Sequence, residues 1–117
     1  MAEVSALRDD VAIGASFEGY VVEEIAAIVS RRARLYFYRT HSGNEVDLVV
    51  IGRDGRMACV EVKAGSAASL TRGSYSALDD LGPEITYVVA QVEEPYPKGE
   101  RVEVVPLAVA LERLRGW

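Results

Sequence analysis

One stretch of the chain, EVDLVVIGRDGRMACVEVK, constrains the fold more than any other. Two apolar runs rich in β-branched residues, Glu45–Ile51 and 57–63, flank the turn-forming segment GRDGR and predict a β-hairpin packed on a core. Three charged residues interrupt these strands, namely Asp47, Glu61 and Lys63. Isolated buried charges are strongly unfavourable unless they are paired or bind a metal, so these side chains are expected to have partners.

The length of the turn determines which of these charges meet. A two-residue DG turn would place Asp47 opposite Val62 and direct Glu61 to the other face of the sheet. A three-residue RDG loop, closed by glycine in the left-handed conformation, instead places Asp47 opposite Glu61 and Glu45 opposite Lys63. The second register gathers all four charges on one face. Because opposed carboxylates repel, a divalent cation between them and the lysine beside them would stabilise this arrangement.

Composition indicates an ordinary globular protein. The chain has 117 residues, of which 50% are hydrophobic and 26% charged, which fits a single domain over 1–117. Its one cysteine, Cys59, excludes a disulfide framework, and the acidic start MAEVSALRDD is unlike a signal peptide. With no apolar run of membrane-spanning length, a cytoplasmic location without membrane contact is expected. The net charge of −5 argues against a dedicated nucleic-acid binder, whose contact surface is usually basic.

Periodicity along the rest of the chain predicts further helices and strands around the hairpin. A first helix is expected from the N-cap Ser16 to about Arg31, and a second over 70–81 with Ser69 as N-cap. The other expected elements are a short helix over 6–13, strands over 35–40, 85–92 and 101–105, and a last helix from Pro106 to about Arg115.

The order of these elements predicts an α/β fold. It runs helix, three-stranded antiparallel meander, helix, strand, and the crossover through the second helix makes the strand that follows parallel to the third strand. The result is a central mixed sheet flanked by helices. This is the core of the restriction-endonuclease-like fold, and the paired Asp, Glu and Lys resemble the active site of the PD-(D/E)xK nucleases.

Within that superfamily, the chain looks most like the nuclease-like domain that follows an AAA ATPase module in many prokaryotic ATP-binding proteins of uncharacterised function. The matching segments are GASFEGYVVEEI, YFYRTHSGNEVDLVV, VEVK and VEVVPLAVAL, which cover nearly all of the chain from Gly14. Their order and spacing carry the resemblance, because each segment alone is short. These 117 residues hold no ATPase module, because Gly14 and Gly19 have the spacing of a phosphate-binding loop but Tyr20 stands where its lysine would be. The chain is therefore expected to be either a stand-alone domain or the end of a longer protein.

The resemblance implies a hydrolase of nucleic-acid phosphodiester bonds, a magnesium-dependent endonuclease or exonuclease. Carried over residue by residue, it makes Asp47 and Glu61 the metal-binding carboxylates and the main-chain carbonyl of Val62 a further ligand. Lys63 would orient or polarise the attacking water, and Glu18 matches the acid on the first helix. Mg²⁺ or Mn²⁺ suits such oxygen ligands.

The implied partners are nucleic acid, in the first place DNA, an ATPase module, and a second copy of the chain, because related nucleases often dimerise. Arg39 is a candidate phosphate contact, although surface arginines are more often solvated or paired with acids. Glu18 is also explained by the helix dipole alone, which favours an acid in the first turn.

Two other interpretations stay open. Glu45, Asp47, Glu61 and Lys63 would also fit a cross-strand salt-bridge cluster with no metal and no reaction. Alternatively, the chain is a catalytically inactive nuclease-like fold that acts as an interaction or regulatory domain of an AAA ATPase. The acidic composition favours the inactive domain, whereas retention of all four charged positions favours the enzyme.

Overall fold

A computed structural model provides the structure of this chain and describes residues 2–6, by their main chain, and residues 16–117. These residues form seven strands and three helices, which follow one another as β1 (Ala2–Ala6), α1 (Phe17–Ile28), β2 (Arg34–Thr40), β3 (Glu45–Ile51), β4 (Met57–Val62), α2 (Arg72–Leu81), β5 (Ile85–Val89), β6 (Tyr96–Gly99), β7 (Val102–Val105) and α3 (Leu107–Leu114). Of the short helix expected over 6–13, Ala6 belongs to β1 and residues 7–13 lie outside the described part of the chain.

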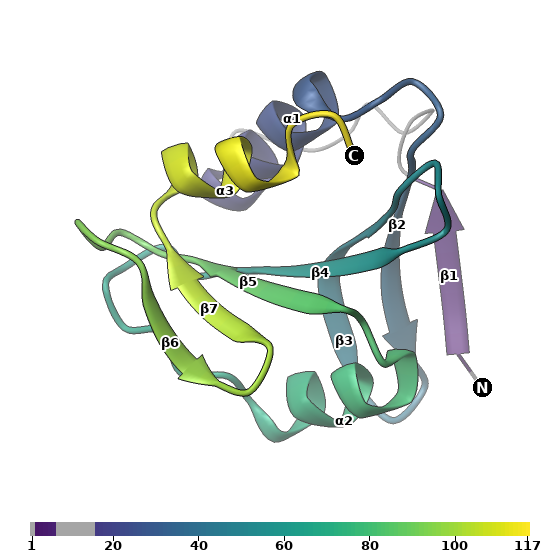
Figure 1. The fold of residues 1–117 in the computed structure, drawn as a ribbon. Helices are drawn as coiled ribbons and strands as arrows, with labels where there is room; N and C mark the ends of the chain where they lie inside the picture. Colours follow the sequence, from purple (N-terminus) through teal and green to yellow (C-terminus); the bar gives the residue numbers. More distant parts are fainter. Residues whose placement is uncertain (1, 7–15) are drawn as a thin grey trace.

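All of these strands belong to one mixed sheet, with the order β1-β2-β3-β4-β5-β7-β6 (Figure 1). Strands β2, β3 and β4 form the antiparallel meander that the sequence predicts. The crossover through α2 makes β5 parallel to β4, and β7 lies parallel to β5. The expected α/β class, a central mixed sheet flanked by helices, is therefore confirmed.

Two strands at the edges of the sheet were not predicted. β1 pairs antiparallel with β2, and β6 pairs antiparallel with β7. Every residue of β6 is exposed, and its sequence YPKG includes Pro97 and Lys98. Proline and lysine are typical of edge strands because they discourage pairing with another chain.

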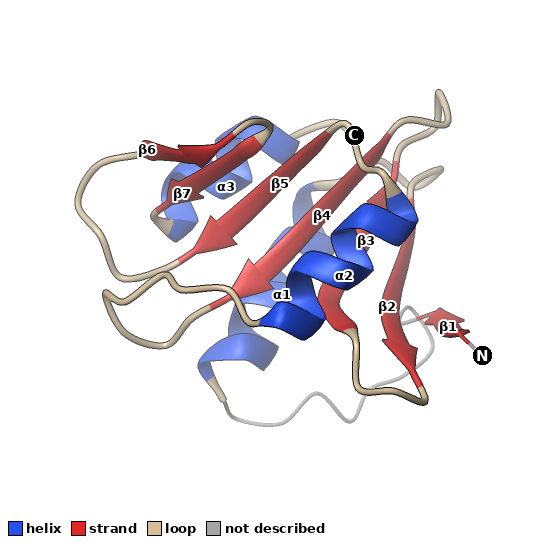
Figure 2. Cartoon of the chain, turned by 90° about the horizontal axis from the view of Figure 1, so that it is seen from below, coloured by secondary structure: helices blue, strands red, loops and turns tan. Residues whose placement is uncertain are grey.

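The helices cover both faces of the sheet. α1 and α3 lie together on one face, and α2 lies on the other (Figure 2). The larger buried cluster lies under α1 and α3 and includes Ile25, Leu48 and Val60. A smaller cluster on the α2 side joins Val46 and Cys59. The central strands therefore bury both faces, which explains their nearly continuous apolar sequence.

The helix ends are fixed by capping residues. Ser16 caps α1 as predicted, because its hydroxyl accepts a hydrogen bond from the Gly19 amide at 3.0 Å, but the helix ends at Ile28, before the expected Arg31. For α2 the N-cap is Thr71 instead of Ser69. Gly82, with φ of 59°, ends α2 in the left-handed conformation that glycine adopts without a steric penalty.

In the described part of the chain, the helices are too short or too polar to cross a bilayer.

Candidate functional site

The β3–β4 hairpin has the three-residue loop that the sequence predicts. Ile51 pairs with Met57, and the Gly52 amide donates to the Arg56 carbonyl at 2.8 Å. The three residues 53–55 therefore form the loop, which closes through Gly55 at φ of 88°. Continued beyond its last backbone pair, the same register places Asp47 opposite Glu61. The register prediction is therefore confirmed, and it brings together two acids that are far apart in the sequence.

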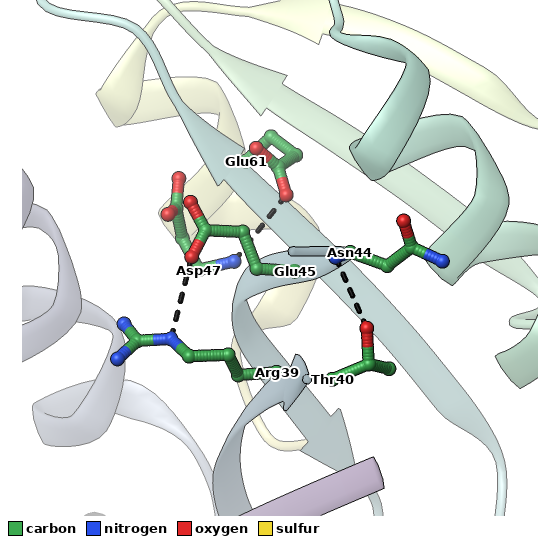
Figure 3. A network of polar contacts seen from close by, with 6 residues as sticks. All are labelled: Arg39, Thr40, Asn44, Glu45, Asp47 and Glu61. Carbon is green, nitrogen blue, oxygen red and sulfur yellow. Dashed lines mark hydrogen bonds and ion pairs between the residues drawn. The ribbon is translucent and has the colours of Figure 1, made fainter. Parts of the chain in front are cut away.

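The carboxylates of these two acids each bind a main-chain amide of the other strand. The Val62 amide donates to Asp47 Oδ2 at 2.8 Å. The Asp47 amide donates to Glu61 Oε1 at 3.3 Å, a bond drawn in Figure 3. In a regular antiparallel ladder such amides bind carbonyl groups of the partner strand. Here the regular pairing ends at Leu48 and Val60, and the side chains of Asp47 and Glu61 connect the two strands beyond that point.

A bulge in β3 determines the direction of Asp47. The register between β2 and β3 shifts by one residue between Tyr36 and Tyr38, so Phe37 of β2 faces both Asp47 and Leu48 of β3. Leu48 packs in the core under α1, while Asp47 lines a cavity beside that helix. The bulge therefore aims the carboxylate out of the core, as bulges next to functional sites often do.

This bulge corrects the prediction that all four charges share one face. Counted from Leu48 and Val60, which pack under α1, plain alternation would place both Asp47 and Glu61 on the α2 side. The bulge turns Asp47 and Glu45 to the cavity on the α1 side. Glu61 reaches Asp47 through the gap between the strands, so the site spans that gap instead of one face.

A cavity of about 210 Å³ lies between α1 and strands β2 and β3. Its walls carry the carboxylates of Glu18, Glu45 and Asp47. Glu18 lies in the first turn of α1 and, as expected, faces the acids of β3, because it lines the same cavity as Asp47 and the charge of Asp47 helps to raise its pKa. Three acids from two elements therefore meet at one concave surface.

Glu45 has a different partner from the one predicted. The sequence placed it opposite Lys63, but the pairing of β3 with β4 ends before it reaches these residues. Instead, Arg39 Nε lies 3.4 Å from Glu45 Oε2, and Figure 3 shows this ion pair beside Asp47. Lys63 is half-buried directly after β4, and its amide donates to the Val89 carbonyl at 2.8 Å. Its backbone is thereby fixed by β5.

Burial and neighbouring negative charge raise the pKa values of two of these acids. Glu61 is only 3% exposed, and its burial, followed by the charge of Asp47, raises its pKa to about 8. The Asp47 amide and Lys63 oppose part of this shift. The pKa of Glu18 is also raised, first by partial desolvation and then by Asp47. The direction agrees with the expected rise in a carboxylate pKa, but burial is its first cause and crowding by Asp47 only the second.

The donors for a metal ion are oxygen atoms. In the described ranges 2–6 and 16–117, no group of three or more His, Cys, Asp and Glu side chains is arranged to hold a metal ion. Asp47 and Glu61 supply two carboxylates. The Val62 amide binds Asp47, and the amide and carbonyl of one residue in an extended strand point to the same side, so the Val62 carbonyl is also directed toward β3. By the chemistry of their oxygen atoms, two carboxylates and one carbonyl suit Mg²⁺, which usually binds only one or two carboxylates and retains several waters.

Comparison with known proteins gives a family without an assigned function. A family model described as a domain of unknown function (DUF4143) matches residues 13–110. Two relatives, the uncharacterized proteins Mb2031c of Mycobacterium bovis and Rv2008c of Mycobacterium tuberculosis, are each 37% identical to the chain over 101 residues. The match covers 86% of this chain but only 22% of each relative, so the chain spans about a fifth of their length. No solved structure matches significantly.

Proposed function

The chain belongs to the DUF4143 family, and we propose that it is a metal-dependent nuclease-like domain of the PD-(D/E)xK type, which hydrolyses phosphodiester bonds of nucleic acids. The observation that carries this proposal is the pair Asp47 and Glu61 at the point where β3 and β4 separate. The pair has Lys63 two residues further along the chain and a cavity beside it.

The acids have the electrostatics expected of a cation site. Glu61 is buried next to Asp47, and its pKa is raised first by that burial and then by the charge of Asp47. A divalent cation held by Asp47, Glu61 and the carbonyl of Val62 would offset the negative charge of the two acids, and Mg²⁺ or Mn²⁺ fits these donors. When bound, it would lower the pKa of a water molecule and stabilise charge on the phosphoryl oxygens.

The remaining steps belong to side chains of this domain. Lys63 follows the end of β4, where its ammonium group would orient the attacking water and favour its deprotonated form. The Val62 amide holds Asp47 Oδ2, which fixes the direction of that carboxylate before any substrate arrives. Glu18 would hold a water or the cation from the α1 side of the cavity.

A second candidate function is that of an inactive nuclease-like fold that serves as an interaction or regulatory domain. The observation that favours it is the length of the relatives, because the matched segment is only 22% of each. The domain thus occurs within longer proteins, and an attached AAA ATPase module would be its partner. The net charge of −5 is also better suited to a protein partner than to nucleic acid. Either function would take place in the cytoplasm. Either is also compatible with a homodimer of the chain.

The test is a cleavage assay with DNA and RNA, single-stranded and duplex, at low salt with Mg²⁺ or Mn²⁺. Asp47→Ala should abolish cleavage because it removes a metal ligand. Lys63→Ala should reduce it by a factor of about 100, the usual scale for one electrostatic or acid-base group. Lys63→Ala should still fold, because the contact with Val89 uses the main-chain amide.

Lys98→Ala is a matched control, because Lys98 is an exposed lysine on the edge strand β6. It should cleave like the wild type. If the wild type cleaves no form with either metal, and Asp47→Ala binds Mn²⁺ as the wild type does, the nuclease proposal is wrong and the interaction domain is favoured.

A further inference from the structure

The cavity beside Asp47 contains groups that the proposed hydrolysis does not use. Phe37 and Arg39 of β2 both line it, together with Asp47. The Arg39 guanidinium carbon lies 5.9 Å from the centre of the Phe37 ring, within the range of a cation–π contact. An aromatic ring and a guanidinium therefore lie next to each other at the wall that carries the candidate metal ligand.

The charges of the cavity set a problem for any nucleic-acid substrate. Glu18, Glu45 and Asp47 would all repel a phosphate, and Arg39 is the only basic residue among the described residues of the lining. The ion pair with Glu45 holds the guanidinium in place, although 63% of the Arg39 side chain stays exposed. A phosphate can therefore reach the exposed part of the Arg39 guanidinium directly, because this side chain is not buried.

Phe37 has a position set by the bulge. It faces Asp47 and Leu48 in the shifted register and is only partly buried, so part of its ring is accessible from the cavity. Aromatic side chains beside basic groups bind single strands, because unpaired bases stack on the ring while the cation contacts the backbone. Bases inside a duplex cannot stack in this way.

Resting on the proposed nuclease function, we propose that this cavity binds one unpaired nucleotide, with its base against Phe37 and its phosphate on Arg39. The substrates are then single strands or unpaired ends of DNA or RNA, instead of continuous duplex. Both side chains are positioning residues, because they hold the strand so that the neighbouring phosphodiester lies at Asp47. A cavity of about 210 Å³ is smaller than the pockets that enclose whole ligands, so it would receive the base, while the sugar and phosphate stay at its exposed rim beside Arg39.

The experiment compares one labelled oligonucleotide as a single strand, in a blunt duplex, and in a duplex with an unpaired overhang, each in DNA and RNA forms. Binding is measured by fluorescence anisotropy in a Lys63→Ala background, in which slow cleavage leaves the strand intact. Single strand and overhang should bind at least about 10-fold more tightly than blunt duplex. Phe37→Leu should weaken single-strand binding roughly 10-fold, the effect of losing one stacked base.

Salt dependence separates the two roles. Arg39→Gln should lower the slope of log affinity against log salt by about 0.7, as expected for one lost phosphate contact on a single strand. Phe37→Leu should leave that slope unchanged, and Arg39→Lys should restore it. In the cleavage assay, Phe37→Leu and Arg39→Gln, each in the otherwise wild-type chain, should raise KM and leave kcat nearly unchanged. Tyr96→Leu and Arg34→Gln, exposed residues of β6 and of the far end of β2, are the matched controls.

The possible results distinguish the nucleotide pocket from the nuclease function on which it rests. The inference is overturned if blunt duplex binds as tightly as single strand, or if the two variants, folded by circular dichroism, bind like their controls. If no form is cleaved but binding keeps its dependence on Phe37 and Arg39, the nucleotide pocket stands and the nuclease proposal fails. If no form binds or is cleaved, both fail.

Discussion

Replacing Glu61 by glutamine should make the protein more stable at neutral and alkaline pH. Glutamine keeps an oxygen that accepts the hydrogen bond from the Asp47 amide, but it cannot ionise. In the wild type, burial and Asp47 raise the Glu61 pKa from 4.5 to about 8. The unfolded chain therefore ionises first, and between these two values the folded state binds more protons. Stability is thus unaffected below the unfolded pKa and falls as the pH rises toward the folded pKa.

The size of the effect follows from the two pKa values. Each pKa unit corresponds to about 1.4 kcal/mol of unfolding free energy. The slope of unfolding free energy against pH flattens near the folded pKa. Between about pH 6 and about pH 8, the wild type should therefore lose roughly 2 kcal/mol of stability relative to the variant. For a domain of this size, the difference in Tm between Glu61→Gln and the wild type should therefore grow by about 8 °C over this pH range.

Thermal unfolding followed by circular dichroism across this pH range in metal-free buffer measures the Tm difference. Glu112→Gln, an exposed position on α3, is the control and should keep a constant difference from the wild type. A Tm difference between Glu61→Gln and the wild type that does not change with pH would refute the reasoning, because it would mean that Glu61 is not held as a buried neutral acid.

Three further predictions concern the backbone around the site. Gly55→Ala should cost about 1 kcal/mol in urea unfolding, because φ of 88° is strained for any residue with a Cβ; an unchanged unfolding midpoint would argue against the tight loop. Gly73→Ala should destabilise by roughly 1 kcal/mol or more despite the better helix propensity of alanine, because its Cβ would lie 3.0 Å from the Gly43 carbonyl oxygen; calorimetry that shows stabilisation would contradict this close packing. Arg101→Gly should stabilise by about 1 kcal/mol in the same calorimetric assay, because exposed Arg101 has φ of 61°; a loss of stability would indicate an interaction that offsets this strain.

Local signals in the sequence determined much of the fold. The RDG loop set the register that brings Asp47 and Glu61 together, because a glycine in the left-handed conformation closes only certain loop lengths. Ser16 marked the start of α1, and Gly82 marked the end of α2. These features depend on bonds between residues a few positions apart, so the residue types themselves contain the information.

The edge strands were decided by tertiary pairing. β6 has the sequence YPKG, which by itself indicates a turn, and it is a strand because β7 supplies its hydrogen-bond partners. The choice of Thr71 over Ser69 as N-cap also depends on where the chain leaves the sheet, because both residues carry a hydroxyl suited to capping. Propensity is a weak guide wherever two segments compete for the same role.

The shape of the candidate site was also decided by the tertiary structure. Sequence alternation predicts that Glu45, Asp47, Glu61 and Lys63 share one face, and nothing in the residue types of β2 or β3 signals the bulge opposite Phe37. That bulge belongs to the pairing of β3 with β2, whose register shifts by one residue, whereas the pairing of β3 with β4 keeps one register throughout. The sequence therefore determined which acids meet, while the packing of three strands determined where they point and how deeply Glu61 is buried.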